Sequence, residues 1–206
     1  MNGSRAANGA HETVAVLGGA CFRCVMTLDH AGLLNGMRRG WDAAMGLRWV
    51  RATADELVAE LDVDERHRQR FMVRSPDGDA HGAAGRSTWR SAPKRHGLVH
   101  GGVYSGLIEV ICSAGAAIDA MARGHGGAVG LENHTTFVRA TRGGTIRGTA
   151  RPITRGRRTH VWEAEVRDAE GVLLATGRVR LLVLERGETP ASAKSEPTSS
   201  DEEAKS

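Results

Sequence analysis

A single carboxylate interrupts the most apolar stretch of the chain, and it is the residue best suited to chemistry. Glu109 stands between Ile108 and Val110, within a predicted helix that runs from Gly101 to about Arg123. A carboxylate in apolar surroundings costs free energy unless it is partnered or does chemistry. The sequence leaves two interpretations open. Either Glu109 faces solvent or an internal salt bridge, or it serves as a catalytic base or nucleophile.

Two glycines and a serine stand at spacings that suit the same reaction. Gly101 and Gly102 open the predicted helix, and a helix N-terminus offers backbone N–H groups and a positive dipole end to an oxyanion. Glycine also lets a substrate approach those groups closely. Ser113 follows Glu109 by one helical turn and therefore shares its face. There it holds the carboxylate or a water, or it is simply a small residue in a tight helix contact.

Cysteine and charge usage favour some classes of protein and exclude others. Cys21 and Cys24 could form half of a zinc site or a redox pair, but no second Cys/His pair stands at ligand spacing, so we predict no metal and no cofactor. The formal net charge is +4, yet the arginines are spread along the chain and aromatic residues make up only 4%. This pattern indicates a solvated surface or a small anionic ligand and no nucleic-acid partner. The odd cysteine count and the poor signal-peptide pattern predict a cytoplasmic protein with no membrane partner.

The surrounding sequence predicts the elements that position these residues. Apolar residues between Leu33 and Met45 recur at helical spacing, which predicts one amphipathic helix. Alternating apolar residues predict two strands joined by a turn at 53–55, and then, after the long helix closed by Gly124, further strands. These later strands are expected at 128–139, 145–154, about 160–166 and 173–183, as an antiparallel meander. The order favours an α+β fold in which one sheet wraps around one long central helix.

Three segments fall outside this pattern. Residues 1–28 are Gly/Ala-rich without clear periodicity, and 187–206 contain almost nothing to bury. We therefore expect a poorly ordered N-terminal extension, a domain over 29–186 and a disordered tail. Inside the domain, 70–96 is predicted to be an inserted loop, of a length that is uncommon unless a loop is functional or disordered.

The segment from His96 to Glu109, HGLVHGGVYSGLIE, resembles the signature of hotdog-fold acyl-CoA thioesterases. The similarity is to the branch that contains phenylacetyl-CoA, dihydroxynaphthoyl-CoA and 4-hydroxybenzoyl-CoA thioesterases, and it continues through 129–133, 156–162 and 177–184. It implies hydrolysis of an aryl or short- to medium-chain acyl-CoA to the free acid and CoA. It also implies a homo-oligomer, either a dimer or a dimer of dimers.

The resemblance also implies roles for individual residues. Gly101 would supply the oxyanion donor with His100 beside it, and Glu109 would attack the thioester to form an anhydride or act as general base for water. Ser113 matches a Ser/Thr of the family at that spacing. Contacts with the substrate or its CoA portion are implied at Gly102, Gly130, Val138, Arg139, Gly156, Arg157, Arg158 and Thr159.

One expected residue has no direct match. The family's glutamine position before the motif holds Lys94, whereas Gln69 lies on the far side of the long insertion. Either Gln69 is brought back by the loop, or Lys94 or His96 replaces it, or activity is impaired. The alternative function is a non-catalytic acyl-CoA-binding protein in which the insertion blocks turnover.

Helix geometry adds a prediction about assembly. Gly101 and Glu109 would lie roughly 12 Å apart along one helix axis, at 1.5 Å per residue. An oxyanion donor and an attacking group must both reach atoms of one carbonyl. We therefore predict an obligate homodimer in which each site uses Gly101 from one chain and Glu109 from the other.

Overall fold

The computed structural model describes residues 28–69 and 97–188, together with the backbone of four short strands outside these ranges. The short strands are β1 Val16–Leu17, paired with β2 Ala20–Cys21, and β5 Met72–Arg74, paired with β6 Trp89–Ser91. The predicted extension and tail lie almost wholly outside the described residues, as does most of the predicted insertion 70–96.

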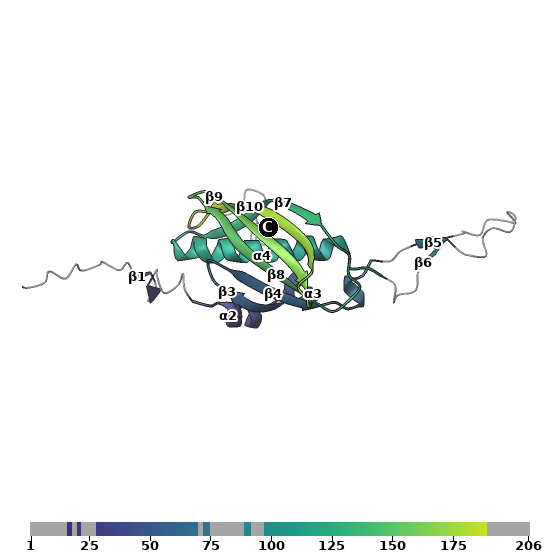
Figure 1. Cartoon of the computed structure of the whole chain (residues 1–206). Coiled ribbons are helices and arrows are strands. Elements are labelled where there is room, and N and C mark those ends of the chain that lie inside the picture. The colour runs from purple at the N-terminus through teal and green to yellow at the C-terminus, as the bar shows by residue number, and fades with distance from the viewer. Residues whose placement is uncertain are drawn as a thin grey trace, which may run out of the picture.

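The main sheet has six antiparallel strands in the order β3-β4-β8-β9-β10-β7 (Figure 1). The strands are β3 Arg48–Ala52, β4 Leu57–Asp62, β7 Gly127–Phe137, β8 Thr145–Arg155, β9 Thr159–Asp168 and β10 Leu173–Leu184. Burial alternates along β9, where Trp162 and Val166 are buried and Glu163 and Glu165 are exposed. One face of the sheet therefore packs inward and the other faces solvent. The strands predicted from alternation are confirmed.

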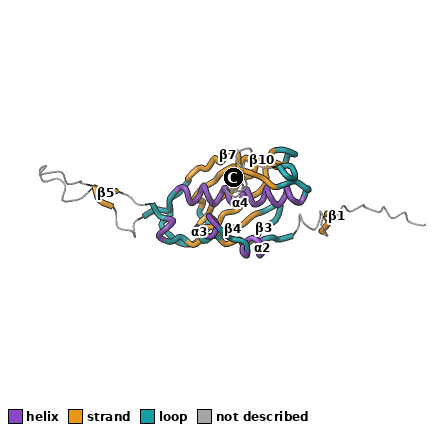
Figure 2. Tube along the Cα trace, turned by 180° about the vertical axis from the view of Figure 1, so that it is seen from behind, coloured by secondary structure: helices purple, strands orange, loops and turns teal. Residues whose placement is uncertain are grey.

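The central helix is α4, Gly101–Ala122, and the sheet curves around it (Figures 1 and 2). It packs against β4, β7, β8, β9 and β10. A Cβ at Gly115 would lie 2.4 Å from the Trp162 ring, so only glycine allows the helix to approach the sheet this closely. Gly124, with φ +84°, follows the helix end as predicted. The predicted α+β architecture is therefore confirmed.

By length and composition alone α4 could cross a membrane. Half of its most apolar 18-residue stretch is buried inside the protein, which is typical of a core helix enclosed by a sheet.

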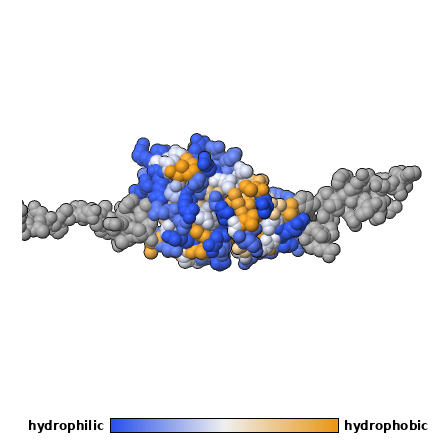
Figure 3. Space-filling view, viewed as in Figure 1, coloured by the Kyte–Doolittle hydropathy of each residue, from blue (hydrophilic) through white to orange (hydrophobic). Residues whose placement is uncertain are grey.

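The prediction of one amphipathic helix before β3 is wrong. The structure has two short helices, α2 Ala31–Gly36 and α3 Gly40–Met45, because Gly40 adopts φ +54° and the chain turns between them. Much of the expected apolar stripe is exposed, including Leu33 and Met37. Figure 3 shows several hydrophobic areas on a face of the molecule that is otherwise mostly hydrophilic.

The predicted meander is correct for β8, β9 and β10 but wrong for β7. β7 pairs with β10 at the edge of the sheet and is not adjacent to β8. The reason lies in residues 138–144. Val138 N–H donates to Leu174 O at 2.8 Å, and Thr141 O accepts from Val99 N–H at 2.9 Å. This segment therefore passes the start of α4 before the chain enters β8, and no tight hairpin forms.

Candidate functional site

The N-terminus of α4 is capped by the residue before it. His100 has extended backbone geometry, and its Nδ1 accepts a hydrogen bond from Gly102 N–H at 2.9 Å. The ring therefore satisfies one of the first backbone donors of the helix. His100 is exposed beside Gly101, and its observed contact is this cap.

A cavity of about 310 Å³ lies beside this helix N-terminus. Its lining is largely apolar and consists of Gln69, Leu98, Val99, Gly101, Tyr104, Phe137, Val138, Arg139 and Ala140. The Phe137 ring lies directly against Gly101, since a Cβ there would be 2.8 Å from Phe137 Cζ. Four predicted site residues, Gln69, Gly101, Val138 and Arg139, therefore share one cavity.

The backbone brings Gln69 to this cavity despite the insertion that follows it. Gln69 comes just after the 3-10 helix η1, Glu65–His67, and its N–H donates to Leu98 O at 2.8 Å. Arg68 forms an isolated antiparallel bridge with Val99, so 70–96 leaves and rejoins the domain at adjacent points. Lys94 and His96, the other candidates for the glutamine role, lie outside the described residues.

The Glu109 carboxylate lies farther along α4 and is held by two neutral donors. Ser113 Oγ donates to Oε1 at 3.0 Å, and Asn133 Nδ2 donates to Oε2 at 3.0 Å. Glu109 is partly exposed, and within 28–69 and 97–188 it has no ion-pair partner. The structural interpretation of Glu109 offered either exposure to solvent or an internal salt bridge. Partial exposure fits the structure, and the salt bridge does not.

Gly130 gives that carboxylate its space. A Cβ at Gly130 would lie 2.4 Å from Glu109 Oε1, which is far inside van der Waals contact. The resemblance implied a substrate contact for Gly130, and the structure places it against the candidate catalytic group.

A bulge in β7 explains how Gly130 and Asn133 both face α4. Glu132 pairs with Arg180 whereas Gly130 pairs with the next residue of β10, so Leu131 has no partner in the ladder. Without this bulge, residues three apart would point to opposite faces of the sheet. Sequence reasoning missed Asn133 as a site residue because no local signal marks the bulge.

The remaining predicted substrate contacts lie at the opposite end of α4. Gly156 N–H donates to Thr159 O at 2.9 Å in the turn between β8 and β9. Arg158 in the same turn pairs with Glu185 and Glu188, and the hydrogen bonds that Arg158 donates to Glu188 raise the pKa of Arg158. Arg157 is the more available cation, with its side chain 79% exposed. Within one chain, this turn and the Gly101 cavity are therefore separated by most of the helix.

The buried Cys112 thiol, on the same helix as Glu109, is a poor candidate for a nucleophile. Burial, and then the charge of Glu109, raise the pKa of the Cys112 thiol, so it remains protonated and a poor nucleophile. No group of three His, Cys, Asp or Glu in 28–69 and 97–188 could hold a metal ion. The side chains of Cys21 and Cys24 lie outside these residues.

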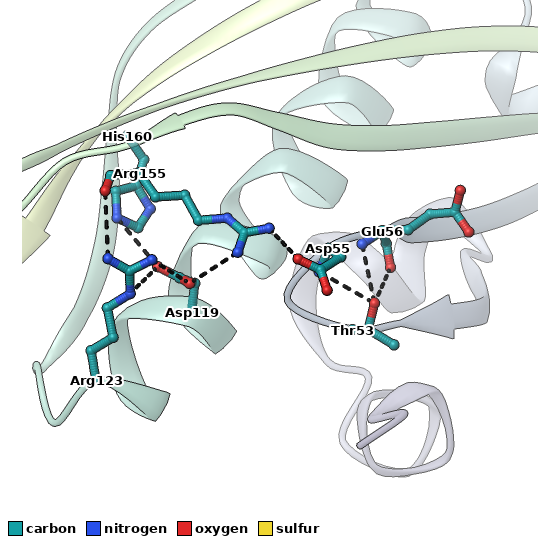
Figure 4. Close-up of polar contacts among 7 residues, drawn as sticks. All are labelled: Thr53, Asp55, Glu56, Asp119, Arg123, Arg155 and His160. Atoms are coloured by element: carbon teal, nitrogen blue, oxygen red, sulfur yellow. Dashed lines mark hydrogen bonds and ion pairs between the residues drawn. The ribbon is translucent and has the colours of Figure 1, made fainter. Parts of the chain in front are cut away.

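A second carboxylate of α4, which sequence reasoning missed, lies in a charged cluster at the end of the helix (Figure 4). Asp119 is fully buried, and Arg123 reaches its two oxygens at 3.0 and 3.1 Å. Arg155 Nη1 lies 3.6 Å from the same carboxylate, and Arg155 Nη2 pairs with Asp55 in the β3–β4 turn. His160 Nε2 lies 3.5 Å from Asp119.

Charges around His160 set its protonation. Burial lowers the pKa of His160, Asp119 raises it, and Arg123 and Arg155 lower it further, with a net lowering. The imidazole is therefore neutral at pH 7. The i, i+4 spacing of Asp119 and Arg123 was the only local signal of this cluster.

The sheet wrapped around one long helix, with a carboxylate on that helix and a cavity at its N-terminus, defines a hotdog-fold protein. Solved structures agree. A candidate esterase of Mycobacterium tuberculosis is 32% identical, with a TM-score of 0.56 over 73% of this chain and 98% of that one. A thioesterase of Haemophilus influenzae, at 24% identity, shares the fold with a TM-score of 0.61 over 79% and 96%.

The chain belongs to the thioesterase superfamily, whose family model matches residues 96–175. By sequence, the Mycobacterium tuberculosis esterase relative is 44% identical over 43% of this chain, a match that spans 64% of that relative. The 1,4-dihydroxy-2-naphthoyl-CoA hydrolase of Escherichia coli is 29% identical over 73% of this chain and 92% of its own length. One of these relatives is thus named an esterase and the other a hydrolase of a CoA thioester.

Proposed function

We propose that this protein is an acyl-CoA thioesterase that hydrolyses an aryl or short- to medium-chain acyl-CoA to the free acid and CoA. The observation that carries the proposal is the Glu109 carboxylate. It is partly exposed on a largely apolar helix, held by Ser113 and Asn133, and given space by Gly130. Neutral donors orient a carboxylate without neutralising its charge, which a base or nucleophile needs.

The N-terminus of α4 and the middle of the same helix have different roles in the proposed reaction. The Gly101 N–H, at the positive end of the helix dipole, stabilises the oxyanion that forms on the thioester carbonyl. As general base, Glu109 takes a proton from the attacking water and returns it to the departing CoA sulfur, so that the free acid and the CoA thiol are released. As nucleophile, Glu109 attacks the carbonyl and forms an anhydride, CoA leaves as a thiolate that takes a proton from water, and a second water hydrolyses the anhydride to the free acid and Glu109. The apolar side chains beside Gly101, among them Tyr104 and Phe137, are suited to the acyl group.

We further propose that the working unit contains two antiparallel copies of α4. One helix separates Gly101 from Glu109 by roughly 12 Å, which is too far for one carbonyl. A second copy in the opposite direction brings its Glu109 opposite the first Gly101. It would also bring the Gly156–Thr159 turn of one chain toward the Gly101 cavity of the other, where Arg139 and Arg157 suit CoA phosphates. A solution mass of one chain under assay conditions would contradict this assembly.

Thiol release from a panel of aryl, short-chain and medium-chain acyl-CoAs tests the function. The wild-type protein should release CoA from at least one class, and Glu109→Gln should lower kcat by about 10²-fold or more. The variant should unfold at the wild-type denaturant concentration, because Glu109 is only partly buried. Binding of the thioesters by both proteins without thiol release would instead favour the non-catalytic acyl-CoA-binding protein.

A further inference from the structure

Asn133 makes the most completely defined polar contacts of any side chain around Glu109. Its Nδ2 donates to Glu109 Oε2 and to Ser105 O, both at 3.0 Å. Its Oδ1 accepts from Thr135 Oγ1 at 2.7 Å. Reversing the amide would bring its carbonyl oxygen against two acceptors, so the contacts allow one orientation only.

These contacts connect two elements that a bulge has brought into register. Asn133 reaches α4 from the edge strand β7, and the unpaired Leu131 shifts the alternation so that both Asn133 and Gly130 face the helix. Ser113 binds one oxygen of the Glu109 carboxylate and Asn133 binds the other. Donors on both oxygens fix the plane of the carboxylate, whereas either donor alone leaves the terminal torsion of Glu109 free.

We propose that Asn133 is a positioning residue for the reaction, which orients the Glu109 carboxylate toward the thioester. This inference rests on the proposed function of Glu109. An oriented carboxylate needs no further rearrangement when the substrate binds, so the loss of Asn133 should lower kcat more than it changes KM. A second charge placed at position 133 gives an independent readout, because neighbouring like charges disfavour ionisation.

Two variants separate these effects. Asn133→Ala removes the donors and adds no charge. It should lower kcat about 10-fold, the scale of one hydrogen bond to a charged group, with little change in KM. Asn133→Asp keeps the shape but places a second carboxylate beside Glu109. The acid limb of its pH–rate profile should lie at higher pH than in the wild type, because neighbouring like charges disfavour ionisation.

The matched control is Thr136→Asp. Thr136 lies on the same strand but faces the outer surface of the sheet, next to Arg178 and Thr176. The Thr136→Asp substitution adds the same charge to β7 but away from Glu109, so this variant should keep the wild-type kcat and pH profile.

The outcomes distinguish this inference from the function on which it rests. If Glu109→Gln is inactive while both Asn133 variants keep the wild-type kcat and acid limb, Asn133 only supports the strand and the inference is wrong. If wild type and Glu109→Gln release thiol equally, the proposed function fails and the positioning role fails with it. A lower kcat with an acid limb moved to higher pH in Asn133→Asp, and an unchanged Thr136→Asp, would support the proposal.

Discussion

Glu109 and Asp119 are carboxylates of one helix, yet their surroundings are opposite. Glu109 is partly exposed and accepts hydrogen bonds from the neutral groups of Ser113 and Asn133. Asp119 is fully buried among two arginines and a histidine. Ion pairing with Arg123 and Arg155 ties Asp119 to the end of the sheet and leaves it no open face.

The difference shows how one helix can carry both a reactive and a structural acid. A carboxylate that reacts must keep its charge available and its lone pairs accessible, so its partners are neutral and few. A carboxylate that joins elements is stabilised by cations that compensate for its loss of hydration. We therefore expect changes at Asp119 to alter the free energy of unfolding, and changes near Glu109 to alter turnover.

The largest effect is expected on the stability of the fold. Asp119→Ala removes the shared partner of Arg123, Arg155 and His160 and should lower the free energy of unfolding by about 3 kcal/mol, as for other buried ion pairs that lose one member. Urea unfolding at a fixed protein concentration measures this. The control is Asp55→Ala, which removes an exposed partner of Arg155 and should cost less than about 1 kcal/mol. Equal losses in the two variants would contradict the structural role of Asp119.

A smaller effect, on turnover alone, is expected from Gly130→Ala. The three atoms nearest to the new Cβ all belong to the end of the flexible Glu109 side chain, so we expect the carboxylate to move and the fold to stay unchanged. We expect kcat to fall by about 10-fold, as for a reacting group displaced by a fraction of an ångström to 1 Å, with the unfolding midpoint nearly unchanged. Gly32→Ala, where nothing lies within 4 Å, should keep the wild-type kcat. Wild-type turnover in Gly130→Ala would show that the Glu109 position in the structure is not the working one.

The smallest effect is a pH dependence of stability at the Asp119 cluster. Because burial lowers the pKa of His160 in the folded protein, the unfolded chain binds a proton more readily. The stabilising contribution of the neutral ring is therefore complete above its ordinary pKa of 6.5 and is lost as pH falls below that value. One proton limits the slope to about 1.4 kcal/mol per pH unit. His160→Gln should flatten this slope in denaturant unfolding, whereas His134→Gln, an exposed control, should retain it.

How far the sequence predicts the site depends on whether the signal is local. Glu109, which interrupts an apolar run, and the turn-spaced Ser113 could be predicted because both lie on one helix. Of the alternatives left open for Ser113, the structure shows the contact with the carboxylate. Asn133 could not be predicted as a partner, because strand alternation gives the wrong face unless the bulge at Leu131 is known. The position of β7 beside β10 is likewise set by long-range pairing, which the turn residues between β7 and β8 do not reveal.

The two acids also differ in how they appear in the sequence. Glu109 interrupts an apolar run, whereas Asp119 stands near the helix end with Arg123 one turn later and resembles an ordinary exposed pair. Its burial depends on Arg155 and His160 arriving from β8 and β9. Gln69 is an intermediate case, because its residue type suggested a role but only the Arg68–Val99 bridge brings it beside Gly101.

The most direct test of the shared site is complementation between two inactive variants. Glu109→Gln removes the attacking group, and Gly101→Val blocks the oxyanion site of the same chain, where a Cβ already meets Phe137. Each homodimer should be nearly inactive, but a mixed dimer contains one intact site and one doubly damaged site. Random exchange between equal amounts should restore about one quarter of the wild-type rate, since half of the dimers are mixed and each has one working site. A mixture that demonstrably exchanges subunits and still releases no thiol would contradict a site shared between Gly101 of one chain and Glu109 of the other.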